Sequence, residues 1–354
     1  MAKPLTKDQL SLHGTGDAEL AAALVARARA AMREIAGASQ GKLDECVTAL
    51  AWSHYRLENA KELAEIAVRD TGLGNVADKI EKIRRKTFGT LRDLSRVKST
   101  GAIEELPQLG LVKYAKPVGV VAALTPSTNP ASTAINKAMM AVKGGNAIVV
   151  APSPKGWTAT ARSVELMRAE LARAGLPADL VQVLPRPVAK ARTDALIAAC
   201  DLVVASGSAD NVRRAYASGK PAIGVGTGNV PVIIDSSANV ADAARKIAAS
   251  KTFDNATSCS SENAVIVLAD VYDAALKALV PKAGIWRARR KNGRSKRGCG
   301  RRARSTAISS PGTRMCSRRL AAWGTRRNTR GSSWWRRRAW GRISPSPAKN
   351  CRLS

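Results

Sequence analysis

One cysteine of the chain has neighbours that are almost all small and polar. Cys259 lies in the stretch KTFDNATSCSSENAVIVLA, residues 251–269, among serine, threonine and alanine. A free cysteine is usually a small core residue and then has apolar flanks. These flanks offer hydroxyl and N–H groups instead, and the apolar run AVIVLA follows directly. The pattern predicts a thiol presented on a loop just before a β-strand, where it can react.

A second polar stretch, ALTPSTNPAST at residues 123–133, follows an apolar run and contains Asn129 before Pro130. Asparagine is a common N-cap and proline a common first helical residue, so the pair can simply begin a helix. The Asn129 amide could also donate a hydrogen bond to an oxyanion. Both interpretations stay open from the residues alone.

The elements that position these residues follow from the periodicity. Residues 17–97 show apolar residues at three- and four-residue steps, which predicts helices, and TGLGN at 71–75 predicts a helix stop. Short β-branched runs then alternate with amphipathic helices, and the expected strands are VGVVAAL, NAIVVAP, LVQVLP, LVVASG, PAIGV and PVIID. Apolar strands separated by helices indicate βαβ units and a parallel sheet. The predicted fold class is α/β, with a doubly wound, Rossmann-like sheet.

Ligands of such a sheet bind at the carboxyl ends of its strands. The glycine-rich run GVGTGN, residues 224–229, is a poor dinucleotide fingerprint because it leads into another strand rather than opening a helix. We therefore discount it as a phosphate cradle.

The charge of the chain is very unevenly distributed. The formal net charge is +31, but all 27 acidic residues lie at or before Asp273, whereas residues 281–354 hold 19 Arg and 4 Lys. The first 280 residues therefore have a net charge of +8, which is ordinary for an enzyme. Charge alone points to no polyanionic partner for that part.

The cysteine and histidine pattern argues against a metal site. The six cysteines, at positions 46, 200, 259, 299, 316 and 351, show no C-x-x-C spacing, and His13 and His54 are the only histidines. We expect neither structural zinc nor a disulfide framework. Cys46 and Cys200 fall in or at the end of expected helices, where burial explains them. No signal peptide or apolar run of membrane-spanning length is present, so we expect a cytoplasmic protein.

Several segments carry a family resemblance. KPVGVVAALTPSTNPASTAINKAMMAVKGGNAIVVAPSPKG, ASGSADNVRRAYASGKPAIGVGTGNVPVIID and FDNATSCSSENAVIV resemble, in order, the coenzyme A-acylating branch of the aldehyde dehydrogenase superfamily. The resemblance covers about residues 20–280, and RDTGLGNVADKIEKIRRKTFGTLRDL is closer to the sulfoacetaldehyde-specific than to the acetaldehyde-specific members. It implies oxidation of a short aldehyde, sulfoacetaldehyde or acetaldehyde, to an acyl-CoA.

The resemblance also implies roles for matching residues. Cys259 matches the nucleophile that forms a thiohemiacetal and then a thioester, and Asn129 matches the amide that stabilises the oxyanion. Hydrolytic members have a glutamate in the segment that matches Val225 and Gly226, where this chain has no acid. That absence favours transfer of the acyl group to coenzyme A over hydrolysis.

Cofactor positions are carried over in the same way. The residues expected to line the dinucleotide are Thr125, Pro126, Ser127, Thr128, Ser153, Lys155, Gly207, Ser208 and Gly226. The loop after NAIVVAP has no acid to hold a ribose 2′-hydroxyl, and Ala151 stands where the family has a lysine. NAD and NADP therefore both remain open as the cofactor, with coenzyme A as co-substrate.

The last 74 residues do not continue the resemblance. Residues 281–354 are rich in Arg, contain five of the seven Trp and have no acid. They could form a nucleic-acid-binding arm, but acid-free composition begins where the resemblance stops, which favours translation out of frame. We expect this tail to be disordered and to bind no specific nucleic acid.

These patterns predict four regions. Residues 1–110 are a helical part of the cofactor domain, 111–250 the Rossmann-like domain, 251–280 the start of a catalytic domain, and 281–354 the tail. An intact protein of this family would form a homo-oligomer, and the chain as given would turn over aldehyde only in traces.

Overall fold

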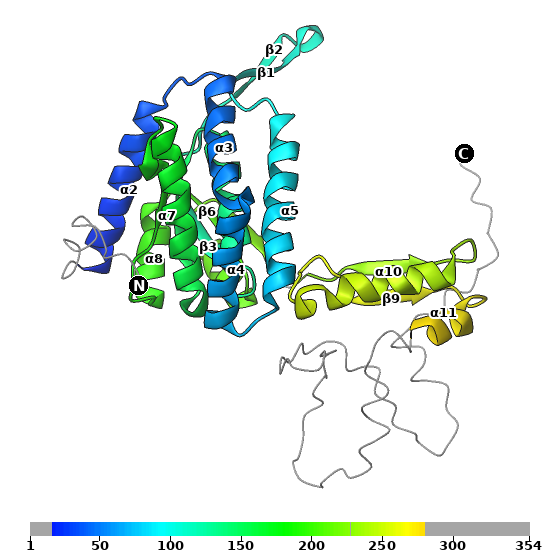
Figure 1. Ribbon diagram of the computed structural model, residues 1–354. Helices are drawn as coiled ribbons and strands as arrows, with labels where there is room; N and C mark the ends of the chain where they lie inside the picture. The colour runs from blue at the N-terminus through cyan, green and yellow to red at the C-terminus, as the bar shows by residue number, and fades with distance from the viewer. Residues whose placement is uncertain (1–15, 227, 280–354) are drawn as a thin grey trace. The chain divides into compact units, whose positions relative to one another are not determined.

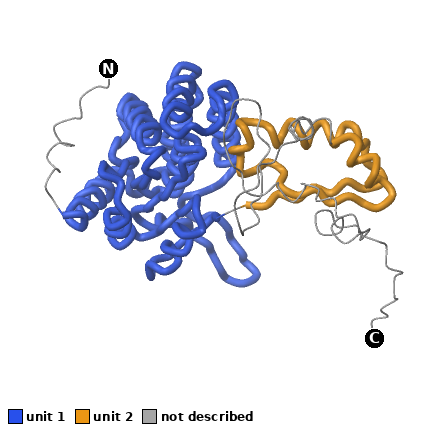
Figure 2. The backbone as a smooth tube through the Cα atoms, turned by 90° about the horizontal axis from the view of Figure 1, so that it is seen from below, with its two compact units in different colours: residues 1–227 blue, residues 228–354 orange. Residues whose placement is uncertain are grey.

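The computed structural model describes residues 16–226 and 228–279, which fall into two compact units divided between residues 227 and 228 (Figure 2). The helices of the first unit are α2 (Asp17–Glu34), α3 (Gln40–Tyr55), α4 (Leu57–Thr71), α5 (Val76–Ser95), α6 (Pro130–Lys143), α7 (Trp157–Arg173), α8 (Lys190–Ala199) and α9 (Ala209–Ala217). Its strands are β1 (Gly101–Leu106), β2 (Leu111–Ala115), β3 (Val120–Thr125), β4 (Ala147–Pro152), β5 (Val181–Val183), β6 (Leu202–Ser206) and β7 (Ala222–Val225). The α/β expectation is confirmed.

A five-stranded parallel sheet with the order β5-β4-β3-β6-β7 organises the first unit. The chain builds outward from β3 to β5 and then returns to the other side of β3, so the switch point of the doubly wound topology lies between β3 and β6. All six residues of β3 and all six of β4 are buried. At the amino edge, the Asp201 carboxylate accepts a hydrogen bond of 2.7 Å from the Val120 N–H and pairs with Arg29.

Helices cover both faces of this sheet (Figure 1). Helices α6 and α7 pack against β3, β4 and β5, and they are covered in turn by α3, α4 and α5. Helices α2 and α8 contact each other, α2 also contacts β4, and α9 packs on β6 and β7. Strands enclosed between helix layers are apolar on both sides, which explains their unbroken apolar sequences.

The expected helical region at the N-terminus is present as α2 to α5. The predicted stop at TGLGN is confirmed, because Gly72 ends α4 in the left-handed conformation with φ of 66°. That conformation is unfavourable for residues with a Cβ atom and is a common helix end for glycine.

The helical region ends at Ser95, and residues 101–115 form an antiparallel hairpin of β1 and β2 that the periodicity did not predict. Its turn passes through Gly110, with φ of 64°. The hairpin projects from the helices of its unit (Figure 1) and exposes Leu109, Leu111 and Tyr114 by 67%, 56% and 62%. Because both strands are exposed on both faces, no alternation of apolar and polar residues marked them as strands.

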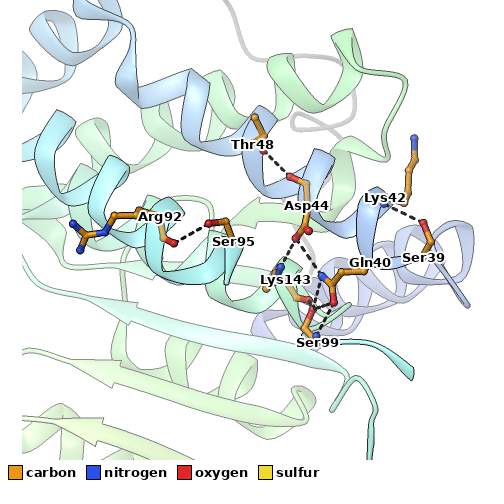
Figure 3. Close-up of polar contacts among 9 residues, drawn as sticks. All are labelled: Ser39, Gln40, Lys42, Asp44, Thr48, Arg92, Ser95, Ser99 and Lys143. Atoms are coloured by element: carbon orange, nitrogen blue, oxygen red, sulfur yellow. Dashed lines mark hydrogen bonds and ion pairs between the residues drawn. The ribbon is translucent and has the colours of Figure 1, made fainter. Parts of the chain in front are cut away.

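Figure 3 shows a polar network that holds the segment leaving α5 against α3 and α6. The buried Lys143 ammonium pairs with the Asp44 carboxylate, and the Gln40 amide donates to the same carboxylate at 3.1 Å. The Ser99 hydroxyl donates to the Lys143 carbonyl at 2.6 Å, while its N–H donates to the Gln40 side chain at 2.8 Å. Asp44 thus compensates the buried Lys143 charge.

A buried histidine links α3 to α7. His54 is fully buried, and its Nδ1 lies 2.7 Å from the Ser53 hydroxyl while its Nε2 lies 2.5 Å from the Ser163 hydroxyl. Burial lowers the pKa of His54 to about 3, so the folded protein holds the neutral imidazole.

The second unit contains β8 (Pro231–Ile234), α10 (Val240–Thr252), β9 (Ala264–Val267) and α11 (Tyr272–Leu279). Strands β8 and β9 pair in parallel, and α10 connects them. A small core of seven buried residues lies between these elements: Ile234, Ala244, Ile247, Val267, Tyr272, Ala275 and Leu279.

The run PVIID had been expected as one more strand of the large sheet. It forms β8, which pairs with β9 of the second unit, and the two compact units divide between residues 227 and 228. Local sequence specifies a strand but not its partner, and here the partner is the run AVIVLA that follows Cys259. No helix in the described parts of the chain is long and apolar enough to cross a membrane. The expectations for the Arg-rich tail lie outside the described residues.

Candidate functional site

The candidate cofactor residues gather at the carboxyl edge of the large sheet. Thr125 ends β3, and residues 126–129 lead into α6. Ser153 and Lys155 lie in the loop after β4, Gly207 and Ser208 follow β6, and Gly226 follows β7. Parallel strands end at the same edge, so residues far apart in sequence meet there, as the Rossmann-like topology predicts.

Close backbone contacts hold these loops together. The Ser153 N–H donates to the Thr125 carbonyl at 3.1 Å, which continues the pairing of β3 and β4 into the loops. A Cβ atom on Gly156 would lie 3.1 Å from the Pro130 Cβ, and one on Gly207 would lie 3.6 Å from the Pro126 Cβ. Gly207 also has φ of 142°, a conformation that L side chains rarely adopt.

Two buried hydroxyls at this edge have no hydrogen-bond partner in the described part of the chain, those of Thr125 and Ser153. A buried polar atom without a partner is costly, and such atoms often mark a place where a ligand or water completes the bonding. Ser208, in contrast, uses its hydroxyl within the fold, where it accepts from the Asn211 N–H at 3.3 Å and caps α9. Its side chain is already engaged as a helix cap.

Asn129 occupies the N-cap position of α6, with Pro130 as the first helical residue, but its side chain makes no cap hydrogen bond. Instead, the Lys82 ammonium donates to the Asn129 Oδ1 at 3.0 Å, and the Lys79 ammonium donates to the Thr128 carbonyl at 3.2 Å. The helix start is therefore confirmed, while the amide does not cap it. Lys82 fixes which end of the amide carries the donors.

A buried lysine joins the two central strands at the switch point. The Lys137 ammonium, on α6, donates at 2.7 Å to the carbonyl of Leu124 in β3 and at 2.7 Å to that of Val204 in β6. Burial lowers the pKa of Lys137 to about 7. The residue thus fixes the spacing of the two strands whose ends carry the Thr125 and Gly207 loops.

Cys259 lies in the second unit and is exposed, as predicted. It sits in a turn of residues 258–261, in which the Ser261 hydroxyl donates to the Ser258 carbonyl at 2.8 Å and the Ser258 and Ser260 hydroxyls lie 3.1 Å apart. The turn precedes β9 directly. Three serines adjoin Cys259 in this turn, and Cys259 belongs to none of the hydrophobic clusters of the described residues.

The segments on either side of this turn are firmly held. The buried Lys251 ammonium donates to the Asn263 Oδ1 at 2.6 Å, and the Asn263 amide donates to the Gly228 carbonyl at 3.3 Å. Residues 254–256 all have positive φ, between 50° and 63°, although none is glycine. Such backbone strain persists only where the surrounding structure over-determines it, and it concentrates at functional loops.

The other two cysteines of the described residues are buried, as expected. Burial raises the pKa of Cys46 to about 11 and that of Cys200 to about 12. Neutral, buried thiols are poor nucleophiles. Of the three cysteines in the described part of the chain, Cys259 is the one whose side chain is exposed.

The structure places Asn129 and all the expected cofactor residues on the first unit and Cys259 on the second. Sequence reasoning missed Lys82 and Lys137. Lys137 had a usable signal, because it lies at the helical phase of the core residues Ala134, Ala138 and Ala141. Lys82 had none, because its partner Asn129 is 47 residues away.

The residues at the carboxyl edge fit a dinucleotide. Two buried hydroxyls without partners, the close approach of Gly156 to Pro130, and the start of α6, α7 and α9 at one edge provide donors and space for phosphate and ribose groups. A cavity of 390 Å³ lies elsewhere, beside Arg33, Ser99 and Gly145 near the amino edge, and none of the candidate residues lines it. Within the described residues, no three His, Cys, Asp or Glu side chains could hold a metal ion.

The described chain combines a doubly wound parallel sheet with a loop that exposes a cysteine, an arrangement expected of an aldehyde dehydrogenase. The family model of the aldehyde dehydrogenase family matches residues 1–295, and the chain belongs to that family. It is 55% identical over 268 residues to the sulfoacetaldehyde dehydrogenase (acylating) of Cupriavidus necator, covering 76% of this chain and 54% of that protein. The chain thus spans about half the length of the curated relatives it matches.

Solved structures show the same architecture. An acetylating aldehyde dehydrogenase from Geobacillus thermoglucosidasius superposes with a TM-score of 0.70 at 36% identity, covering 78% of this chain and 60% of that one. A propionaldehyde dehydrogenase from Rhodopseudomonas palustris, with bound CoA and an acylated cysteine, gives a TM-score of 0.65 at 28% identity, over 75% and 61% of the two chains. The expected resemblance to acylating members is confirmed.

Proposed function

We propose that this chain carries the chemistry of an NAD(P)-dependent, coenzyme A-acylating aldehyde dehydrogenase, acting on a short aldehyde such as sulfoacetaldehyde or acetaldehyde. One observation carries the proposal: Cys259 is exposed in a serine-rich turn that precedes β9. The 55% identity to an acylating sulfoacetaldehyde dehydrogenase supports the substrate class.

In this proposal, Cys259 is the nucleophile. Its Sγ bonds to the aldehyde carbon while the thiol proton goes to solvent, which leaves an oxyanion on the former carbonyl oxygen. Loss of hydride from that carbon restores the C=O bond and gives a thioester on Cys259. The coenzyme A thiolate then attacks the thioester, and Cys259 leaves as thiolate. The nicotinamide of the dinucleotide, when bound, would supply the hydride acceptor.

Asn129 is the proposed oxyanion donor. Lys82 donates to the Asn129 Oδ1, so a hydrogen bond from this side chain to an oxyanion would come from its NH₂ group. Removal of one donor of this kind typically costs about 2.7 to 4 kcal/mol of transition-state stabilisation. Lys82 is then a positioning residue, which acts on the substrate only through Asn129.

Thiol transfer fits the chemistry of the segment around Val225 and Gly226. It contains no carboxylate that could deprotonate a water molecule, and a thiol is a much stronger nucleophile than water at neutral pH. We therefore assign acyl-CoA as the product. In this proposal the dinucleotide would lie along Thr125, Pro126, Ser127, Thr128, Ser153, Lys155, Gly207 and Gly226, with the Ser208 helix cap beside it.

Thioester exchange tests this function without requiring full turnover. The 354-residue chain would be incubated with acetyl-CoA, and separately with acetaldehyde and NAD or NADP, and the acyl mass would be located by peptide mapping. We expect one acetyl group on Cys259 in both reactions. Cys259→Ala should remove it, and Cys46→Ala should leave it unchanged.

Acylation that occurs only on other cysteines, or no aldehyde-dependent acylation with either dinucleotide, would overturn the function. Steady-state turnover of the chain should stay below about 1 s⁻¹, the low end for ordinary enzymes. A higher rate would contradict our expectation for the tail while supporting the function of Cys259.

The β1–β2 hairpin supports a homo-oligomer. It exposes Leu109, Leu111 and Tyr114 on a projecting element, and a second copy of the chain could cover such exposed apolar side chains. Light scattering after gel filtration should show a mass above that of a monomer, and Leu111→Lys should shift it toward the monomer. An unchanged mass in that variant would argue against the hairpin as the interface.

A further inference from the structure

Three segments of the second unit meet at the cysteine that the proposed reaction uses. They are residues 228–230 before β8, residues 251–257 at and after the end of α10, and the turn of residues 258–261 itself. A Cβ atom on Gly228 would lie 3.5 Å from the Cys259 carbonyl oxygen, so the first segment lies directly against the backbone of the nucleophile. The position of the thiol therefore depends on what holds these segments together.

Asn263, the residue before β9, is bonded to the segment that precedes β8. Its N–H donates to the Val230 carbonyl at 2.9 Å, and its side-chain amide donates to the Gly228 carbonyl at 3.3 Å. The first bond extends the pairing of β8 and β9. The second exists only while the nitrogen of the amide, and not its oxygen, faces Gly228.

Lys251 fixes this amide from its other side. The Lys251 ammonium donates to the Asn263 Oδ1 at 2.6 Å, and the lysine is only 7% exposed. An ammonium group donates but does not accept, so the amide oxygen must face Lys251 and the amide nitrogen is left to face Gly228. Burial lowers the pKa of Lys251, while the negative charge of Glu262 opposes that shift. Lys251 therefore determines which way the Asn263 amide points.

The chain between Lys251 and the turn is strained. Residues 254–256 have φ between 50° and 63°, although none is glycine, and such a conformation persists only where the surrounding structure over-determines it. Within this segment, the Thr257 hydroxyl and N–H both donate to the Asp254 carbonyl, at 2.8 and 3.0 Å. Relaxation of the strain would displace the turn that follows, so the restraint at Asn263 on the far side of the turn is needed.

We propose that Lys251 is a positioning residue for Cys259, which it holds in place through Asn263 and Gly228. The inference rests on the proposed function, because Cys259 is the nucleophile of that reaction. Lys251 contacts neither the aldehyde nor the acyl group in this role. A misplacement of about 1 Å can cost roughly a hundredfold in rate, so loss of Lys251 should slow acyl transfer to Cys259 and leave the chemical reactivity of the thiol almost unchanged.

Two reactions of the same thiol in the complete 354-residue chain test this role. Acetylation by acetyl-CoA needs the thiol in a defined orientation toward a bound thioester, whereas alkylation by iodoacetamide from solution does not. Lys251→Met should lower the maximal acetylation rate by about a hundredfold. The half-saturating acetyl-CoA concentration and the alkylation rate should each change by less than about threefold. Peptide mapping restricts both measurements to Cys259.

Further variants test the route through Asn263. Asn263→Ala should slow acetylation as much as Lys251→Met, and the double variant should be no slower than either single variant, because the two residues act in series. Lys251→Arg keeps a donor for the Asn263 Oδ1 and should restore most of the rate. Lys246→Met makes the same charge change on the exposed surface of α10, and this matched control should leave both rates unchanged.

Hydrogen exchange with mass spectrometry gives a measurement that does not need acetylation. Lys251→Met should raise exchange of the amides of residues 257–263 by at least about tenfold, which is the loss expected for a hydrogen bond to a charged group. Helix α11 should keep its protection, because the role of Lys251 is local to the turn.

Three results would overturn this role: acetylation that slows no more than alkylation, unchanged exchange of residues 257–263, or loss of protection in α11 as well, which would make Lys251 a general structural residue. Additive losses in the double variant would refute the route through Asn263. A wild-type chain that is not acetylated on Cys259 would refute the proposed function, and the exchange data would still decide whether Lys251 holds the turn.

Discussion

Both units of the chain contain short apolar runs that form β-strands, but these strands are buried to very different extents. In the first unit, β3 and β4 bury all twelve of their residues between helix layers. In the second, β8 and β9 bury one residue each, and Ile233 is 64% exposed. A sequence that forms a strand does not by itself produce a hydrophobic core, because burial depends on which elements cover each face of the sheet.

The two units also have different proposed roles in the reaction. The first unit has a closed core and the edge proposed to bind the nucleotide, whereas the second holds the thiol beside a small sheet of two strands in the described residues. Two-stranded sheets have little stability of their own. We expect nucleotide binding to depend on the first unit and the nucleophile to come from the second, and four predictions test these roles and the difference in burial.

The largest effect is expected for Cys259→Ala. Loss of the nucleophile should reduce aldehyde-dependent acylation or hydride transfer by more than about a thousandfold. Nucleotide affinity, which depends on the first unit, should stay within about threefold. Rapid-quench acylation and calorimetry measure the two quantities, and a variant that keeps a tenth of the wild-type rate would remove Cys259 from the mechanism.

Asn129→Ala should come next, with a loss of about 10² to 10³ in the rate of the same reaction. Nucleotide affinity should again be almost unchanged, which would separate a transition-state role from a structural one. Lys82→Met should show a smaller loss of the same kind, because it frees the amide to rotate. A rise in KM with constant kcat would contradict this role.

Matched isoleucine substitutions compare the two sheets. Ile148→Ala in β4, where the side chain is fully buried, should lower the unfolding free energy of the first unit by about 2 to 5 kcal/mol. Ile233→Ala in β8 should change that of the second unit by about 0.5 kcal/mol or less. Hydrogen exchange with mass spectrometry in urea reads each unit separately, and equal losses would refute the contrast.

The smallest effect is a pH dependence of the first unit. The folded pKa of His54, about 3, lies below its unfolded value near 6.5, so the contribution to stability is complete above pH 6.5 and is lost as pH falls. The expected slope is about 1.4 kcal/mol per pH unit, or about 2 kcal/mol between pH 6.5 and 5.

The control for this slope is His54→Gln, which cannot titrate. It should lower stability at pH 7 and flatten the dependence between pH 6.5 and 5, as measured by urea unfolding. Carboxylates such as Asp179, whose pKa is lowered below its ordinary value, act only at lower pH. A slope that persists in the variant would assign it to other groups.

Sequence patterns identified most of the first unit, because the strands of its five-stranded sheet are short apolar runs and most of its helices are amphipathic. The pattern could not show that β8 pairs with β9, since pairing depends on a segment 30 residues later. Nor did it reveal the hairpin, whose exposed strands lack alternation. The sequence therefore predicts strands that are buried along their whole length, but it does not predict pairings that depend on distant residues.

The same holds for the candidate site. Cys259 stood out because its neighbours contradict the usual surroundings of a cysteine, and its exposure is confirmed. The stacking of Arg186 on Trp157 joins residues 29 positions apart, and the bond from Lys82 to Asn129 spans 47. Local composition marks the reactive atom, whereas the groups that orient it or its ligands are assembled only by the fold.

The charges at the two edges of the large sheet have a kinetic consequence. At the amino edge, Arg29 and Lys143 pair with Asp201 and Asp44, so the cations there are neutralised. At the carboxyl edge, Arg186 donates to the Thr158 hydroxyl and has no carboxylate partner in the described residues, which leaves its field uncompensated. An approaching anionic nucleotide is drawn toward that edge from about a Debye length away, roughly 8 Å at physiological salt. Added salt should therefore slow capture while leaving the lifetime of the bound state nearly constant.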